Sequence, residues 1–246
     1  MNNKQPSEVS KFLLVTSAVL ILTGAFAAGI YAKNTFLTPQ VLPSAEPKCT
    51  TQECDIQHAT FDKPAIYLYP TSTTDVSVKL DYKGRLTSSY PAFDSSINGW
   101  NVTASPDGAL INDKDHKEYE YLFWEGEGQP FNVNEQEGFV VKGSDTTSFL
   151  QDKLSALGLT PKEYNEFIVY WLPKMEANPY NFVRFLGKEY TDQAVLSVTP
   201  KPDSELRVFM AFKLLQKPAT VKEQVLQPFD RHGFSVIEWG GTELNN

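Results

Sequence analysis

The stretch KPAIYLYP, residues 63–70, opens the part of the chain that is expected to fold into a packed domain. Its apolar and aromatic residues are typical of a buried β-strand, and Pro70 ends the run because proline has no backbone N–H for a sheet. The next segment, VSVKLDY (76–82), alternates apolar and polar residues, which indicates a strand with one buried face. The domain is therefore predicted to be built mainly from strands.

Outward from this opening, strand-like runs recur along the chain. They lie at 99–104, 118–125, 138–143, 167–173, 180–186, 194–200, 206–215 and 234–239. The segment 220–226 fits either a helix or an edge strand. The runs are short and separated by turn residues, a pattern typical of two packed sheets.

Two helices are predicted between these strands. The first covers 145–159, with Asp145 as the N-cap and Gly158 just after its last turn. The second begins at a capping box formed by Thr160 and Glu163. It is predicted to be short, because FIVYWLP (167–173) has the composition of a strand. The fold class expected for residues 63–246 is α+β, mostly β: one β-sandwich-like domain with two inserted helices.

The N-terminal part contains an apolar segment. Residues 12–32 carry no charge over 21 positions, enough for a helix of about 30 Å to cross a bilayer core. Lysines flank the segment, with Lys4 and Lys11 before it and Lys33 after it. The prediction is one transmembrane helix that anchors the protein, with residues 1–11 in the cytoplasm and the rest outside.

A cleaved signal peptide is the alternative for this segment. Ala25-Phe26-Ala27 fits the small-x-small pattern of a cleavage site. The apolar run continues past that site, however, which favours a retained anchor. In both cases the domain is predicted to be extracytoplasmic, and it is secreted if cleavage occurs.

Residues 33–62 are predicted to form a proline-containing linker. The two cysteines of the chain, Cys49 and Cys54, lie within it. An exported pair at this spacing is expected to form a small disulfide loop. No metal site is expected, because a metal would need two more ligands and the three histidines show no ligand spacing.

The composition excludes several classes of function. The formal net charge of −8 and the lack of a basic cluster argue against binding to nucleic acid. The phosphate-binding and dinucleotide-binding glycine motifs are missing, so no cofactor is expected. No serine–histidine–aspartate set can be assembled from the spacing.

Several longer motifs resemble a family of uncharacterised bacterial extracytoplasmic proteins that are secreted or membrane-anchored. The motifs are KPAIYLYP (63–70), YLFWEG (121–126), NEFIVYWLP (165–173), NPYN (178–181), RVFMAFK (207–213) and GFSVIEWGGT (233–242). The resemblance spans about residues 63–243 and implies location and domain extent. That family has no established activity, so the resemblance assigns no catalytic residue.

Two tryptophan–glutamate pairs beside glycines form the first candidate site. Trp124 and Glu125 precede one glycine, and Glu238 and Trp239 precede two. Two carboxylates can act as acid and as base or nucleophile in glycoside cleavage, and tryptophan faces can stack on sugar rings. The glycines would let a ligand approach the backbone.

These pairs also have a purely structural interpretation. The tryptophans would then belong to the core, and the glutamates would cap strand ends or pair with Arg184 or Arg207. No spacing in the sequence decides between these alternatives, because only the fold brings residues 125 and 238 together or keeps them apart.

The stretch WLPKMEANPYNFVRF (171–185) is the second candidate site. It collects polar side chains in a loop between apolar segments, where binding groups often occur. Its candidate ligand-binding residues are Trp171, Glu176, Asn178, Asn181 and Arg184. The structural alternative is a tight turn begun by Asn178, with Arg184 in a surface ion pair.

Taken together, the residues favour a membrane-anchored extracytoplasmic domain that binds a ligand or partner at the cell envelope, a glycan or a protein. One alternative is a cell-envelope hydrolase acting on a glycan or peptide through Glu125 and Glu238. Another is a structural envelope protein without a ligand site.

Overall fold

The structure is a computed structural model and describes residues 58–245. The strands are β1 (Ala59–Tyr69), β2 (Thr74–Tyr82), β3 (Arg85–Tyr90), β4 (Gly99–Ala104), β5 (Leu110–Asn112), β6 (Glu118–Tyr119), β7 (Leu122–Gly128), β8 (Glu137–Lys142), β9 (Tyr180–Leu186), β10 (Ala194–Thr199), β11 (Ser204–Leu215), β12 (Lys222–Glu223) and β13 (Ser235–Glu243). The helices are α1 (Thr146–Leu157), α2 (Pro161–Met175) and α3 (Lys188–Thr191), with a 3-10 turn at Gly143–Asp145.

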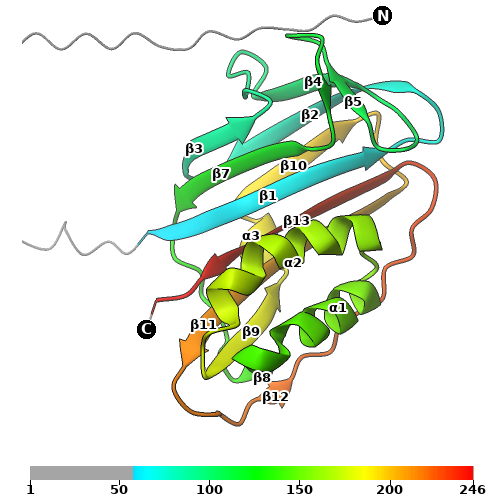
Figure 1. The fold of residues 1–246 in the computed structure, drawn as a ribbon. Helices are drawn as coiled ribbons and strands as arrows, with labels where there is room; N and C mark the ends of the chain where they lie inside the picture. The colour runs from blue at the N-terminus through cyan, green and yellow to red at the C-terminus, as the bar shows by residue number, and fades with distance from the viewer. Residues whose placement is uncertain (1–57, 246) are drawn as a thin grey trace, which may run out of the picture. The chain divides into compact units, whose positions relative to one another are not determined.

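The strands form two sheets, so the fold is a β-rich α+β fold, as predicted at that level. The larger sheet has eight strands in the order β12-β8-β9-β11-β13-β1-β7-β3. The smaller sheet has five, in the order β10-β2-β4-β5-β6. In the larger sheet β1 is an interior strand, antiparallel to both β13 and β7 (Figure 1).

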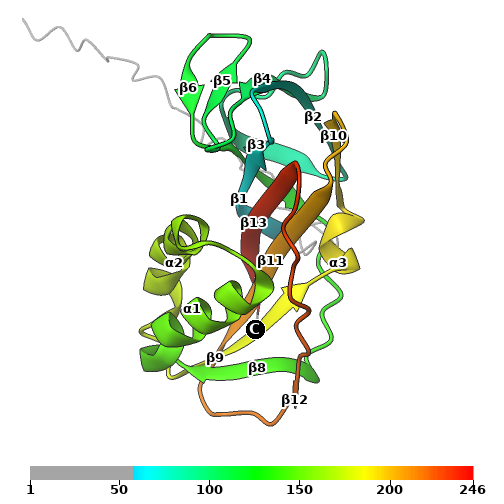
Figure 2. The ribbon, with the colours of Figure 1, turned by 90° about the vertical axis from the view of Figure 1, so that its right-hand side faces the viewer.

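The two faces of the eight-stranded sheet are covered differently. A first core cluster joins one face to the five-stranded sheet, with Trp100 and Val78 from the smaller sheet packing near Phe61 and Trp124. A second cluster joins the other face to α1 and α2. Figure 2 shows the helices on one side of the large sheet and the smaller sheet on the other. The apolar residues thus form three layers, because each sheet face needs a partner to bury it.

Helix α2 corrects the prediction for residues 167–173, which are helical and not a strand. The helix runs for 15 residues from Pro161 to Met175 and contains Pro173 in its last turn. Its buried side chains, which include Phe167, Ile168, Trp171 and Met175, repeat at three- and four-residue spacing. This helical period decides the structure, and it outweighs the β-branched composition of the segment.

Other predicted elements agree closely with the structure. The strands at 99–104 and 180–186 have the predicted bounds. The capping box of Thr160 and Glu163 is present, and Gly158 has the left-handed conformation that ends α1. The segment 220–226 contains the two-residue edge strand β12.

The N-terminal predictions lie mostly outside the described residues. The membrane segment 12–32 and the Cys49–Cys54 disulfide belong to that part of the chain. Within residues 58–245, no helix is long and apolar enough to span a bilayer. The predicted linker 33–62 ends earlier than expected, because β1 already begins at Ala59.

Candidate ligand-binding site

In each tryptophan–glutamate motif the two side chains lie on opposite faces of the large sheet, and the two tryptophans also lie on opposite faces. Trp124 lies in the core between the sheets, whereas Trp239 lies in the core under the helices. Since neighbouring side chains alternate along a strand, Glu125 faces the helices and Glu238 faces the smaller sheet. The two carboxylates therefore do not meet in one pocket, and the predicted pairing of Glu125 with Glu238 as a catalytic pair is wrong.

Glu238 is part of a buried ion pair. Its Oε2 accepts a hydrogen bond of 2.6 Å from Nε of Arg207, and its Oε1 accepts one of 3.2 Å from Nε1 of Trp124. Arg207 is 7% exposed and Glu238 is 0% exposed. The guanidinium also lies 4.8 Å from the ring centroid of Tyr190. This is the structural alternative considered for Glu238, and it leaves the carboxylate closed to any ligand.

The electrostatics of the pair follow from its burial. Burial would lower the pKa of Arg207, but the adjacent Glu238 carboxylate holds it above its usual value. Burial, followed by the Glu238 charge, raises the pKa of Tyr190 well above 10. The Glu238 carboxylate thus holds Arg207 in its ionised form, because an unpaired charge in this core would be costly.

The glycines of the two motifs make room for aromatic rings of the protein itself. A Cβ atom on Gly126 would lie 2.5 Å from the ring of Tyr82, which belongs to the smaller sheet. A Cβ atom on Gly241 would lie 2.6 Å from the ring of Trp171 in α2. The expectation that these glycines admit a ligand is therefore corrected: they allow close packing between layers.

The candidate stacking tryptophans are all inaccessible. Trp124, Trp171 and Trp239 are each 0% exposed. Their rings pack against Phe61, Phe167 and other core aromatics. A sugar ring can stack only on an open aromatic face, so these three residues are core residues and the predicted stacking role for them is wrong.

The loop candidates tie the end of α2 to β9. Nδ2 of Asn178 donates to Oδ1 of Asn181 at 2.7 Å, and Nδ2 of Asn181 donates to the carbonyl of Met175 at 3.0 Å. Glu176 is the exposed C-cap of α2. These contacts match the turn alternative that the sequence left open.

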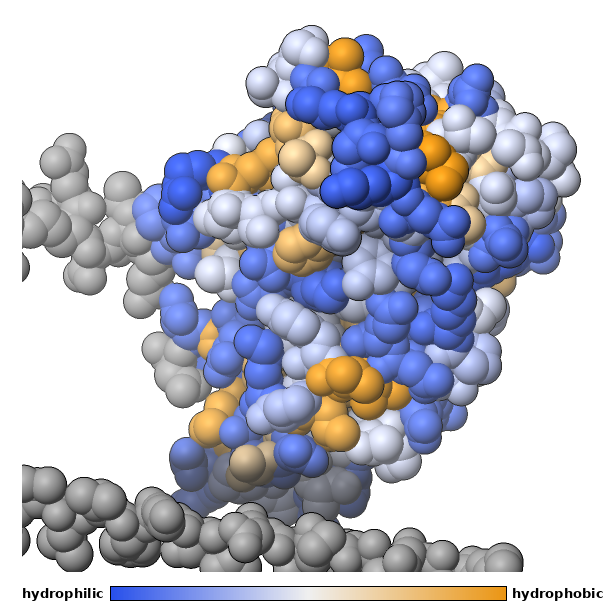
Figure 3. Space-filling view, turned by 45° about the horizontal axis from the view of Figure 1, so that its top comes forward, coloured by the Kyte–Doolittle hydropathy of each residue, from blue (hydrophilic) through white to orange (hydrophobic). Residues whose placement is uncertain are grey.

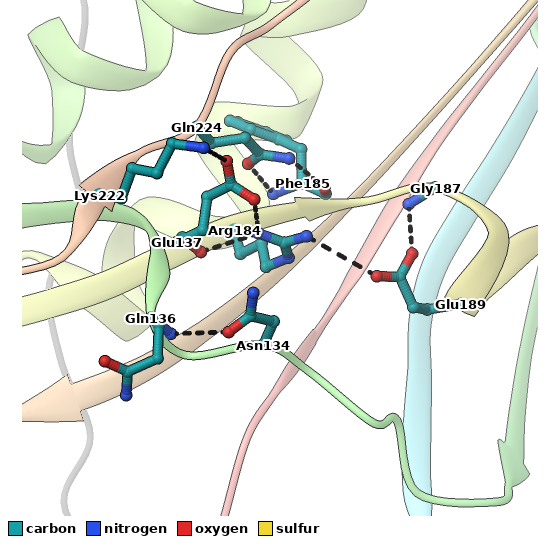
Figure 4. Close-up of polar contacts among 9 residues, drawn as sticks. All are labelled: Asn134, Gln136, Glu137, Arg184, Phe185, Gly187, Glu189, Lys222 and Gln224. Carbon is teal, nitrogen blue, oxygen red and sulfur yellow. Dashed lines mark hydrogen bonds and ion pairs between the residues drawn. The ribbon is translucent and has the colours of Figure 1, made fainter.

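Arg184, shown in Figure 4, also bonds to other groups of the protein and is not a free ligand-binding side chain. Its Nη1 donates to the backbone carbonyl of Glu137 at 2.9 Å and to the Glu137 carboxylate at 3.3 Å. Lys222 and Arg184 hold the pKa of Glu137 below its usual value. Beside it, the side-chain amide of Gln224 bonds both backbone groups of Phe185, at 2.9 and 2.7 Å. The arginine therefore fastens the start of β8 to β9.

A different feature, at Lys63, has the properties of a binding site. The pairing of β1 with both neighbours is irregular between Phe61 and Ala65, and Lys63 has a φ of 57°. This left-handed backbone conformation is rare for a residue with a side chain. It directs the lysine to the helix-covered face, where Nζ lies 4.4 Å from the ring centroid of Tyr121 and 4.9 Å from that of Phe123.

An open groove adjoins this lysine, between α2 and the strands β1 and β7. We call it the α2 groove; it is lined by Lys63, Tyr121, Asn165, Glu166, Val169 and Tyr170 and has a volume of about 560 Å³. Val169 is 75% exposed, although it is a large apolar residue. Two side-chain hydrogen bonds frame the groove: Nζ of Lys63 donates to the Tyr121 hydroxyl at 3.0 Å, and the Tyr67 hydroxyl donates to Glu166 at 3.0 Å.

Two half-buried carboxyl groups lie near the lysine. The backbone N–H of Lys63 donates to Oε1 of Glu125 at 3.3 Å. Burial, and then the charge of Asp62, raises the pKa of Glu125 above its usual value. Burial likewise raises the pKa of Asp62, against the opposing effects of Thr60 and Lys174. The same two carboxylates, after burial, raise the pKa of Tyr170 to about 12.

The sequence contained part of the signal for this site. Lys63 opens the KPAIYLYP motif and Glu125 was a candidate, but Asp62 fell in the predicted linker. Tyr170 was hidden because its segment was assigned to a strand. Within residues 58–245, no group of three or more histidine, cysteine, aspartate or glutamate side chains is arranged to hold a metal ion.

The fold and the groove define a β-rich α+β domain with an aromatic-walled surface groove next to the bulged interior strand β1. A stretch of 66 residues, 26% of the chain, is 47% identical to a Butyrivibrio fibrisolvens protein described as "Uncharacterized protein in bglA 3'region". The match covers 66% of that protein, so the chain spans just under two thirds of the relative's length. No family model and no solved structure matches the chain.

Proposed function

We propose that this protein is a non-catalytic binding module that holds a saccharide of the cell envelope in the α2 groove. The observation that carries the proposal is Lys63, fixed in a strained conformation at the edge of an open groove with aromatic walls. Strained backbone persists where the surrounding structure determines it, and it clusters at binding sites.

The chemistry of the groove fits a polyhydroxylated ligand. Tyr121 and Tyr170 supply aromatic surface on which the apolar face of a sugar ring can pack. Asn165, Glu166 and Lys63 supply donors and acceptors for hydroxyl groups. One lysine and one glutamate line the groove, so their charges balance and a neutral sugar is favoured over a strongly charged ligand. A mainly apolar concavity with few polar groups is the usual form of a small-ligand site.

The cellular setting is also part of the proposal. Residues 12–32 would anchor the chain in the membrane and place residues 33–246 outside, as a sandwich-like domain on a proline-containing linker. If residues 12–32 are cleaved, the same domain is secreted. The face of the domain in Figure 3 is mainly hydrophilic with separate apolar patches, which suits a domain in contact with water.

The hydrolase alternative has less support. It required Glu125 and Glu238 in one pocket, but Glu238 is sealed in its ion pair with Arg207. A structural envelope protein without a ligand would not need an open groove of about 560 Å³ beside a strained lysine.

Binding of peptidoglycan fragments and common polysaccharides to the full-length chain in detergent tests the proposal. The variant Tyr170→Ala should weaken binding about two- to tenfold, because a lost aromatic contact is worth about 0.5–1.5 kcal/mol. Lys63→Met should weaken it as well. The matched controls are Tyr90→Ala, an exposed tyrosine on β3, and Lys79→Met, an exposed lysine on β2.

Both controls should bind as the unchanged chain does. Equal affinity in Tyr170→Ala and Tyr90→Ala would rule out the α2 groove as the binding site. Turnover of the saccharide that Glu125→Gln abolishes would replace the binding module with an enzyme.

A further inference from the structure

Strand β10 forms an open edge of the five-stranded sheet. Within residues 58–245 it pairs only with β2 and is the terminal strand in the sheet order. Figure 2 shows β10 at the outer border of the molecule, beside α3. A terminal strand leaves a row of backbone donors and acceptors that another strand can pair with.

The backbone register shows which groups face outward. The N–H of Lys83 donates to the carbonyl of Gln193 at 2.8 Å, so Gln193 bonds toward β2. Because bonding alternates along an antiparallel strand, the N–H and C=O groups of Ala194, Leu196 and Val198 point away from β2. Their side chains turn toward the core, where Leu196 and Val198 are only half-buried.

This edge lacks the usual protection against pairing. The six residues AVLSVT (194–199) contain no charge and no proline, and the outward Val195 is 41% exposed. Among the described strands, the other sheet ends differ: β12 and β6 have two residues each, and β3 begins with Arg85. Natural proteins protect sheet edges with short strands and charged side chains, so an uncharged edge of this length indicates a partner.

We propose that β10 is a self-association surface, on which a second copy of this chain adds its own β10 in antiparallel orientation. The two small sheets then join into one sheet across a two-fold axis at Leu196. This inference goes beyond the saccharide site and does not depend on it.

The sequence of the edge is complementary to itself in this arrangement. With Leu196 opposite Leu196 of the second copy, every outward-facing backbone group of β10 has a partner, Ala194 meeting Val198. The half-buried leucines then cover each other. The exposed Asp192, which also pairs with Lys188 of its own chain at 3.2 Å, precedes the strand and the exposed Lys201 follows it, so the antiparallel order brings Asp192 of one copy close to Lys201 of the other. A two-fold interface requires this kind of self-complementarity.

Cysteine cross-linking of the full-length chain in detergent tests the register. Cys49 and Cys54 are first replaced by serine. One copy then carries Val195→Cys and a differently tagged copy carries Ser197→Cys, since these two positions face each other as a non-hydrogen-bonded pair. Oxidation of the mixture should give a disulfide-linked heterodimer. Asn101→Cys, on the exposed face of the interior strand β4, mixed with Ser197→Cys is the matched control and should give none.

A charge placed on the edge tests the energetics. Ser197→Lys should weaken dimerisation about tenfold, which corresponds to about 1.4 kcal/mol, whereas Asn101→Lys should leave it unchanged. Sedimentation in detergent measures both. The proposal is overturned if the chain is monomeric, if Ser197→Lys and Asn101→Lys dimerise equally well, or if the control mixture cross-links as strongly as the test mixture. Capture of a different extended peptide by a monomeric chain would also overturn it.

Discussion

The environments of Glu238 and Glu125 differ completely, although each residue lies beside a tryptophan and close to a glycine inside an aromatic strand. Glu238 is 0% exposed, forms an ion pair with Arg207 and accepts a hydrogen bond from Trp124. Glu125 is half-buried, beside Asp62 and near the open groove. The difference arises from strand alternation alone, which turns one carboxylate into a closed core and the other toward a surface. A short motif therefore specifies a strand and its packing, but the layer that covers the strand decides the role of the polar residue.

The sharpest test of this comparison is Glu238→Gln. The change leaves the buried Arg207 without its hydrogen-bonded counter-charge, so it should lower the free energy of unfolding by about 3–5 kcal/mol. Urea denaturation of the full-length chain in detergent measures this through tryptophan fluorescence. The fluorescence reports on the domain, because all four tryptophans are buried residues of the described part.

Adding Arg207→Met to Glu238→Gln provides the control. The double variant should regain part of the lost stability, since replacing both buried charges avoids an unpaired ion. A Glu238→Gln protein as stable as the unchanged chain would mean that the ion pair is not buried in solution.

Much of the fold could be predicted from the sequence, because local signals and tertiary packing agree in most segments. The strand at 99–104 and the caps at Gly158 and Thr160 are examples. The exception is α2, whose segment FIVYWLP has strand composition and a proline. Its helical period becomes clear only when Met175 is included, and the helix is stabilised by burial of Trp171 against the large sheet.

The candidate site was less predictable, for a topological reason. The sequence gives no information on which side of a sheet a residue faces until the order of the strands is known. Pairing of Glu238 with Arg207 was one of the alternatives predicted from the sequence. Only the parallel pairing of β11 with β13, however, places the two residues opposite each other. The binding role considered for Trp124 failed for the same reason.

The glycines provide the second test of the comparison, with a smaller expected effect. Gly241→Ala places a Cβ atom 2.6 Å from both the Met210 carbonyl oxygen and the Trp171 ring. Overpacking of this kind costs about 1–3 kcal/mol. Gly126→Ala meets only the ring of the half-buried Tyr82, which can shift more easily. Urea denaturation should therefore rank Gly241→Ala as the less stable variant, and the opposite order would contradict this account of the two layers.

The smallest expected effect on the free energy of unfolding is that of Glu125→Gln. This variant should be stabilised, whereas the Glu238→Gln and glycine variants should be destabilised. The amide retains an oxygen that can accept from the Lys63 N–H, while the repulsion from Asp62 disappears. At pH 7 the variant should be slightly more stable than the unchanged chain, by less than about 1 kcal/mol, because solvent screens a half-buried pair.

The pH dependence of this difference distinguishes the cost of the half-buried charge, from burial first and from Asp62 second, from a packing effect. A carboxyl group whose pKa is higher in the folded than in the unfolded chain binds more protons when folded, so it costs stability as pH rises through the interval between the two values. The raised pKa of Glu125 therefore predicts that the advantage of Glu125→Gln is full above the folded pKa and vanishes as pH falls below the unfolded value of about 4.3. Asp62→Asn should follow the same course, since burial raises its pKa too. Stability differences measured from pH 4 to pH 7 that stay constant would show that folding raises the pKa of neither carboxyl group, and the α2 groove would then lack the half-buried charges that distinguish it from the closed site at Glu238.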